Sequence, residues 1–344
     1  MFRKLISVLL LTSLIFQQIG YAQSVAPVPA AISLSTADAF RPVHLRAVRF
    51  SLSDKTLLLD ADSGDQNIGP LDHNNQLVDL FFTGLQLPAK DLWVNLRPDA
   101  SDKIISQGLD NTELGRIFLA ADVQLKKDLS ALTDPRTPAG KKYWNALYTK
   151  AEELFKDSDI EVPTITRPWI VPGEILIRQS QCQAYIYKAT LRVKLEEDYI
   201  AAVGSNGLAS VSIAPNTDLR LKELNTYSSE LLKSSILPQL NRRVNSSSEY
   251  ASLRQAYFSL ILAQWVKNND PALARKFLKT YSPEKSQAWS KQSYYQQYRK
   301  SFEQGEYRIE EQVRSPGGAT IRTYYSGGIV IPEMSAFITT ARAD

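Results

Sequence analysis

The chain has 344 residues, of which 44% are hydrophobic and 22% charged, and its formal net charge is +4. A net charge this small gives no reason to expect a nucleic-acid partner or an anionic membrane surface. Its one cysteine, Cys182, excludes an intrachain disulfide, so a chain of this length has to be stabilised by its own hydrophobic core.

Residues 1–22 have the features of a cleavable signal peptide. Arg3 and Lys4 precede an uncharged, mostly apolar run over residues 5–16. This run has the length of a signal-peptide core and is too short to span a bilayer. Gly20-Tyr21-Ala22 then offers small residues at the positions that signal peptidase recognises, which predicts cleavage directly after this tripeptide. We expect an exported chain, periplasmic or secreted, soluble and with no stable transmembrane anchor; an uncleaved N-terminal anchor is the alternative.

The first part of the mature chain predicts a leader and a β-hairpin. Residues 23–40 are rich in Ala, Ser and Pro, which is typical of a flexible leader. Residues 43–51 and 56–60 are predicted strands joined by a turn at Ser53-Asp54-Lys55. A polar loop over residues 60–76 then precedes a predicted short helix (77–87) and a predicted short strand (91–96).

The middle of the chain is predominantly helical. Apolar residues recur every three or four positions from Leu114 to Leu132, which predicts a helix that Asp134-Pro135 ends. A second helix is predicted from Pro138 to about Lys156. Residues 161–172 contain several prolines and indicate an extended connector.

A central β-hairpin is predicted over residues 174–178 and 184–195, where Tyr185, Tyr187, Leu191 and the other odd-numbered residues alternate with the even-numbered ones. Further helices follow a Gly/Ser/Asn loop (203–215). In the first of them Pro238 should cause a kink, the next should open with a capping box ending at Glu249, and its body, 250–266, should be buried nearly all round. Two more helices are predicted over residues 272–281 and 291–302.

The chain closes with a second predicted hairpin, residues 307–314 and 319–325, around the turn Ser315-Pro316-Gly317-Gly318. The predicted fold class is therefore α+β: N-terminal, central and C-terminal hairpins packed with a helical, bundle-like middle. We expect a single domain over residues 41–340; a division into two lobes near residues 161–172 is the alternative.

The sequence contains no recognisable catalytic motif. His44 and His73 are the only histidines, and neither lies in a nucleophile or zinc motif. No nucleophile elbow, P-loop or dinucleotide-binding glycine pattern is present. We therefore expect no catalytic residue, no resident cofactor and no enzymatic activity.

One loop has the composition of a calcium site. Asp60, Asp62, Asp65 and Asn67 place oxygen ligands at short intervals around a glycine, as Ca²⁺ requires. The glycine is out of register for an EF-hand and no glutamate completes the loop. A solvated loop is the alternative, because Asp and Asn are also common in exposed turns.

Two further groups are candidates for binding or catalysis. Glu196-Glu197-Asp198 is the densest acidic group, but adjacent strand residues point to opposite faces, which favours a solvated strand end. Trp289, Tyr294 and Tyr298 lie among basic residues and are the candidate ligand surface, since exposed aromatic rings stack on sugars. At helical spacing the two tyrosines also fit a packing stripe. Trp169 is expected to be a core anchor.

Seven segments together resemble an uncharacterised family of bacterial extracytoplasmic proteins, units of which also occur within very long secreted chains. The segments are 91–98 (Asp-Leu-Trp-Val-Asn-Leu-Arg-Pro), 114–116 with 125–128, 167–172, 184–189 (Ala-Tyr-Ile-Tyr-Lys-Ala), 221–225, 250–265 and 325–328 (Tyr-Ser-Gly-Gly). No activity is assigned to that family, so the resemblance implies no functional residue and favours a binding or structural module. Gly173 departs from the acidic residue more usual there, which puts a site built around residues 171–174 in doubt.

The sequence thus leaves two main functional hypotheses. The first is a non-enzymatic exported module that binds other envelope or extracellular proteins or glycans. The second is a hydrolase of envelope polysaccharide, which needs two carboxylates from different segments to converge in a cleft. Calcium-dependent adhesion is a third possibility that depends on the loop at Asp62.

Overall fold

The computed structural model describes residues 39–51, 56–65, 74–156, 161–203, 218–280, 289–311 and 320–340. The chain from Ala39 onward forms one compact unit. The predicted signal peptide, the leader up to residue 38, both predicted turns (53–55 and 315–318), Asn67 and His73 lie outside the described residues.

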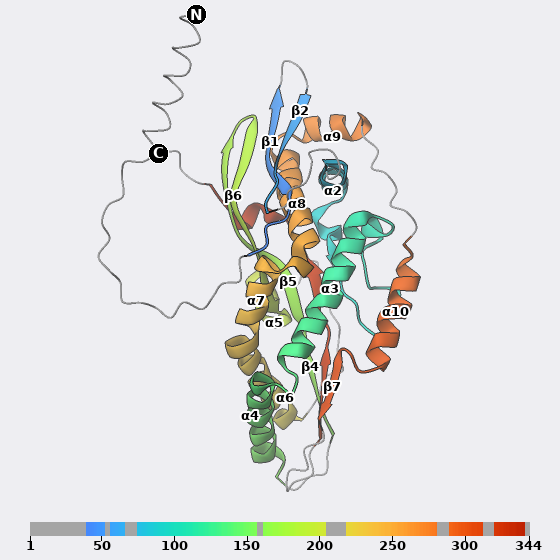
Figure 1. The fold of residues 1–344 in the computed structure, drawn as a ribbon, viewed down its shortest axis with the longest axis vertical. Helices are drawn as coiled ribbons and strands as arrows, with labels where there is room; N and C mark the ends of the chain where they lie inside the picture. Colours follow the sequence, from blue (N-terminus) through green and yellow to red (C-terminus); the bar gives the residue numbers. More distant parts are fainter. Residues whose placement is uncertain are drawn as a thin grey trace, which may run out of the picture. The chain divides into compact units, whose positions relative to one another are not determined.

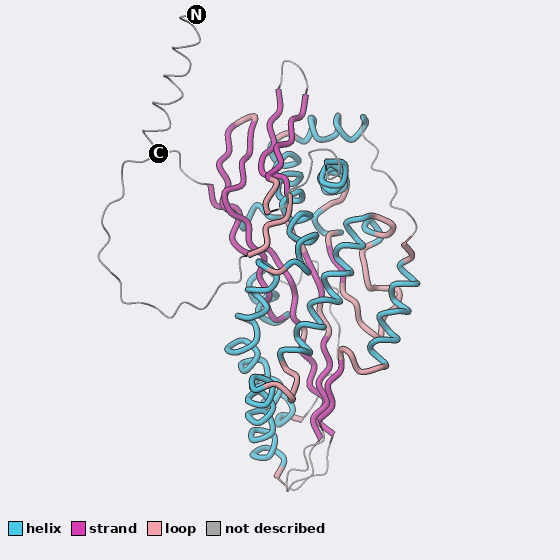
Figure 2. Tube along the Cα trace, in the orientation of Figure 1, coloured by secondary structure: helices cyan, strands magenta, loops and turns pink. Residues whose placement is uncertain are grey.

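A seven-stranded mixed sheet forms one part of the fold, in the order β2-β1-β6-β5-β9-β3, with β10 also paired to β5 (Figures 1 and 2). The β5–β9 and β5–β10 pairs are parallel and the others antiparallel. The strands are β1 (His44–Ser51), β2 (Thr56–Asp62), β3 (Trp93–Val94), β5 (Pro168–Ser180), β6 (Gln183–Leu195), β9 (Gly328–Val330) and β10 (Ile338–Thr340).

A second sheet has the order β4-β8-β7, with strands β4 (Glu161–Thr166), β7 (Arg308–Glu311) and β8 (Thr320–Tyr325). The chain passes from β4 directly into β5, and from β8 directly into β9, so two neighbouring strands run from one sheet into the other. The Ser326 amide donates to the Thr166 carbonyl at 2.9 Å at the point where the two strands pass from one sheet into the other. Gly327 follows with φ +121°, and a Cβ there would lie 2.1 Å from the Pro168 carbonyl oxygen, so only glycine fits.

Helix α8 is the centre of the hydrophobic core, since residues from Leu253 to Val266 are buried on nearly all sides. It packs against α2, α3, α9, β1 and β6 (Figure 1). This confirms the prediction from the uniformly apolar sequence. The helices are α2 (Asn74–Gln86), α3 (Glu113–Leu132), α4 (Pro138–Phe155), α5 (Glu196–Val203), α6 (Leu219–Leu231), α7 (Leu237–Ser246), α8 (Ala251–Asn269), α9 (Pro271–Thr280) and α10 (Lys291–Glu303).

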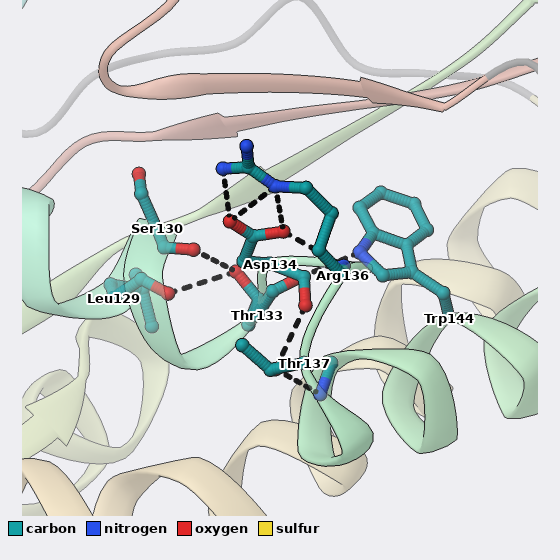
Figure 3. A network of polar contacts seen from close by, with 8 residues as sticks. Leu129, Ser130, Thr133, Asp134, Arg136, Thr137 and Trp144 are labelled. Atoms are coloured by element: carbon teal, nitrogen blue, oxygen red, sulfur yellow. Dashed lines mark hydrogen bonds and ion pairs between the residues drawn. The ribbon is translucent and has the colours of Figure 1, made fainter.

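The turn between α3 and α4 is held by local polar contacts, which Figure 3 shows. The Asp134 carboxylate accepts from the Arg136 amide at 2.8 Å and from its guanidinium. Thr137 caps α4 by accepting from the Gly140 amide at 3.0 Å. The Trp144 indole then donates to the Thr133 carbonyl at 2.7 Å, which ties the buried face of α4 to the end of α3.

Pro238 disturbs the helix it lies in, as its missing amide predicts. A π-helical turn, Leu232–Ile236, separates α6 from α7 just before this proline. The capping box predicted over residues 246–249 is wrong. Ser246 is the last residue of α7, its hydroxyl donates to the Arg242 carbonyl at 2.8 Å, and a 3₁₀ turn, Ser248–Tyr250, precedes α8.

The predicted α+β class, with its three hairpins and helical middle, is confirmed. Two local predictions are corrected. Residues 161–172 are not an unpaired connector but β4 and the start of β5, because β8 and β6 satisfy their backbone groups. Glu196 does not end a strand but begins α5.

Candidate functional site

The predicted calcium ligands that the structure describes, Asp60, Asp62 and Asp65, accept hydrogen bonds from neighbouring groups of the protein. Asp60 lies in β2 and accepts from the Arg49 guanidinium at 2.9 Å. Asp62 accepts from the Gly64 amide at 2.9 Å, and this hydrogen bond lowers the pKa of the Asp62 carboxyl.

Asp65 accepts from the Arg41 amide at 2.7 Å and from its Nε at 3.0 Å. The described residues contain no group of three or more His, Cys, Asp or Glu side chains that could hold a metal ion. Asn67 lies outside the described residues, so the calcium hypothesis keeps only the support of its sequence pattern.

His44 and Glu196, the first residue of the acidic group, are both buried and in contact with neighbouring side chains. His44 is buried against the Phe258 ring, 4.2 Å between centroids, and burial lowers its pKa. Glu196 is 6% exposed and accepts from Arg167 at 3.0 Å and from the Trp169 indole at 3.1 Å. A buried carboxylate with two donors stabilises the junction of β5 with α5, so the prediction of a solvated strand end is wrong for Glu196.

The prediction that Trp289, Tyr294 and Tyr298 form a ligand surface is corrected in part. Tyr298 is 2% exposed, stacks on Tyr307 at 5.2 Å and faces the core from α10. Tyr294 is half-buried and meets Trp289 edge-on at 6.5 Å. The two tyrosines therefore belong to the packing stripe that their helical spacing also predicted, and only Trp289 reaches a surface depression.

This depression, hereafter the Trp289 depression, has a volume of about 450 Å³ and lies between the start of α10 and the segment before α3. Asp102, Asp110, Asn111 and Gln292 also line it. The Trp289 indole donates to the Thr112 carbonyl at 3.1 Å, which fixes the ring beside the N-terminus of α3.

Two features of Asp110 and its neighbour make the Trp289 depression unusual. Asp110 Oδ1 is buried with no hydrogen-bond partner among the described residues, while Oδ2 lies 3.5 Å from the Lys291 amine. Asn111 has φ +62°, a left-handed conformation that costs free energy for a residue other than glycine. An unsatisfied acceptor beside a strained turn is a combination that binding sites frequently contain.

A second group of polar residues is fully buried. Asp122 and Lys126 lie one turn apart on α3, are 0% and 1% exposed, and form an ion pair. Asp122 also accepts from the Leu96 amide at 2.7 Å, and Lys126 donates to the Gly327 carbonyl at 2.9 Å. The pair thus connects α3 with the segment after β3 and with the link between β8 and β9.

Burial raises the pKa of Asp122 and lowers that of Lys126, and their mutual attraction opposes both shifts. The Tyr298 ring lies 5.9 Å from the Lys126 amine, within cation–π range. Because this pair is sealed in the core, its geometry supports a structural role. The sequence contains one signal for it: Asp122 and Lys126 lie one helical turn apart among the apolar residues of α3, where Asp128 is buried as well.

No described helix is long and apolar enough to cross a membrane. Comparisons with protein-family models, with curated proteins and with solved structures found no match for this chain.

Proposed function

We propose that this protein is an exported, non-enzymatic binding module whose ligand is a saccharide of the cell envelope or extracellular space. The observation that carries the proposal is the Trp289 depression. An anchored indole lies there beside carboxylate, amide and hydroxyl groups, and one carboxylate oxygen of Asp110 has no partner in the described part of the chain.

This composition matches the surface of a pyranose. The apolar face of a sugar ring packs on an indole, while its hydroxyl groups donate to carboxylates and to amide oxygens. Sugar hydroxyl groups can donate to the carboxylates of Asp102 and Asp110, which both line the depression. The indole keeps its orientation through the hydrogen bond to Thr112, so ligand binding requires little ordering of the side chain.

The test is titration calorimetry of the mature chain with soluble oligosaccharide fragments of the envelope. Trp289→Ala should weaken binding at least about tenfold, since loss of a stacked ring costs about 1–3 kcal/mol. Leu219→Ala is the matched control, because Leu219 is 78% exposed and lines another surface region. Equal affinities of Trp289→Ala and the unmodified chain would refute the proposal.

The hydrolase of envelope polysaccharide is the second candidate, because two carboxylates, Asp102 and Asp110, line the same depression. Paired carboxylates beside an aromatic ring are the groups that glycoside hydrolysis needs. An assay for new reducing ends, with Asp110→Asn and Asp102→Asn as variants, separates the two functions. Release of reducing ends that both variants abolish would favour the hydrolase over the binding module.

A further inference from the structure

Two β-bulges meet on the larger sheet. In β1, Leu45 and Ala47 pair with consecutive residues of β2, which leaves Arg46 as an extra residue. In β6, Ile186 and Lys188 pair with consecutive residues of β5, which leaves Tyr187 as the extra residue. The Arg46 guanidinium donates to the Tyr187 carbonyl at 3.1 Å, so the extra residue of the β1 bulge satisfies a backbone carbonyl at the β6 bulge.

The bulges gather aromatic and basic side chains on one face of the sheet. Tyr185 lies opposite Ala47 of β1 and Arg178 of β5, and directly paired residues share a face. The Tyr185 and Tyr187 rings contact each other at 5.0 Å, and the Arg46 guanidinium lies 5.3 Å from the Tyr185 ring centre. We call Arg46, Arg178, Tyr185 and Tyr187 the twin-bulge patch.

The twin-bulge patch is open and positively charged. Tyr187 is 45% exposed, and Arg178 is also exposed. Within the described residues no carboxylate lies within ion-pair distance of Arg46 or Arg178. The neighbouring Arg49 is paired with Asp60, and Asp62 interacts with Arg46 from beyond ion-pair distance, so Arg46 and Arg178 give the patch a positive charge that Asp62 only partly offsets.

We propose that the twin-bulge patch binds an anionic polysaccharide, one whose sugar rings carry carboxylate or similar acidic groups. Guanidinium groups form paired hydrogen bonds with carboxylates, and tyrosine rings pack on the faces of pyranose rings. The residues lie on three adjacent strands, about 5 Å apart from one strand to the next. An extended polymer can therefore contact all four side chains at once, whereas a folded protein partner would need a larger apolar area than two tyrosines provide.

The proposal is independent of the Trp289 depression, which lies on other elements. It is tested by affinity electrophoresis of the full mature chain in gels containing polygalacturonate, with methyl-esterified polygalacturonate as the uncharged counterpart. We expect retardation only by the acidic polymer, and at least about tenfold weaker binding for Tyr187→Ala and for Arg178→Gln, in line with 1–3 kcal/mol per stacked or ionic contact.

Lys142→Gln is the matched control for charge, since Lys142 is exposed on α4, far from the patch in sequence and on another element. It should bind as the unmodified chain does. Equal losses for Lys142→Gln and Arg178→Gln would overturn the proposal, because binding would then depend on net charge alone. Retardation by the esterified polymer, or equally patch-dependent binding of single-stranded DNA, would overturn it as well.

Discussion

Replacement of Lys126 by methionine tests whether the buried ion pair is a structural element of the core. Methionine keeps the length and apolar stem of lysine but removes the ammonium group, so Asp122 remains 0% exposed without its charge partner. Removal of one member of a buried pair costs about 3–5 kcal/mol, because the other charge stays desolvated. Total stabilities of about 5–15 kcal/mol are usual, so this loss is large enough to measure by urea unfolding.

The double variant Asp122→Asn with Lys126→Met separates charge from shape. An asparagine at position 122 can still accept from the Leu96 amide, a bond of 2.7 Å in the structure, and it leaves no unpaired charge in the core. We expect the double variant to recover most of the lost free energy of unfolding, to within about 2 kcal/mol of the unmodified chain.

The pH dependence of Lys126→Met gives a second readout. Burial raises the pKa of Asp122, and removal of the ammonium group removes the attraction that opposes this shift. The folded variant then holds a proton that the unfolded chain releases. Its free energy of unfolding should therefore fall as the pH rises above about 4, by up to about 1.4 kcal/mol per unit, until the folded-state pKa is passed. A loss below about 1 kcal/mol with no pH dependence would refute the reasoning.

Three further substitutions test single contacts by the same unfolding measurement. Gly327→Ala should lower the free energy of unfolding by at least about 3 kcal/mol, because the new Cβ would lie 2.1 Å from the Pro168 carbonyl oxygen and the residue has φ +121°. A near-neutral result would contradict the close approach of Gly327 to Pro168 where the strands pass from one sheet into the other. Glu196→Gln should cost about 2–3 kcal/mol by weakening two buried hydrogen bonds, and an unchanged melt would mean that they contribute nothing. Tyr298→Phe should be neutral or stabilising, since the Tyr298 hydroxyl is buried with no partner among the described residues; a loss above about 1 kcal/mol would show that it has one.

Of the residues that line the Trp289 depression, the sequence predicted only Trp289 as a candidate for ligand binding. Trp289 stood out as a large ring among polar residues, and it lines the depression. Asp102 was not singled out, and Asp110 and Asn111 suggested only a helix cap, because Asp and Asn in a polar segment indicate caps and turns. Their convergence with Trp289 joins segments about 180 residues apart in the chain, and no local pattern records such a contact.

Most of the helices and the hairpins follow from local information, and the sequence by itself determined these here, whereas α5 was not predicted. The spacing of apolar residues placed α3, α4 and α8, and alternation with turn residues placed the β1–β2 and β5–β6 hairpins. The sequence did not determine which side chains of β6 are buried. Its sequence predicts one buried set from Tyr185 to Leu195, yet Tyr187 is exposed while Ile186 and Leu191 are buried.

The bulge at Tyr187 causes this change of phase, and only the tertiary structure decided it. One extra residue in a strand moves every following side chain to the opposite face, and its position depends on how the partner strands pair. The same applies to β4, whose partner β8 lies about 160 residues away, and to the hydrogen bonds of Asp122 and Lys126 with the backbone of Leu96 and Gly327. Local periodicity determines which elements form, whereas strand register and buried polar partners depend on contacts between distant segments.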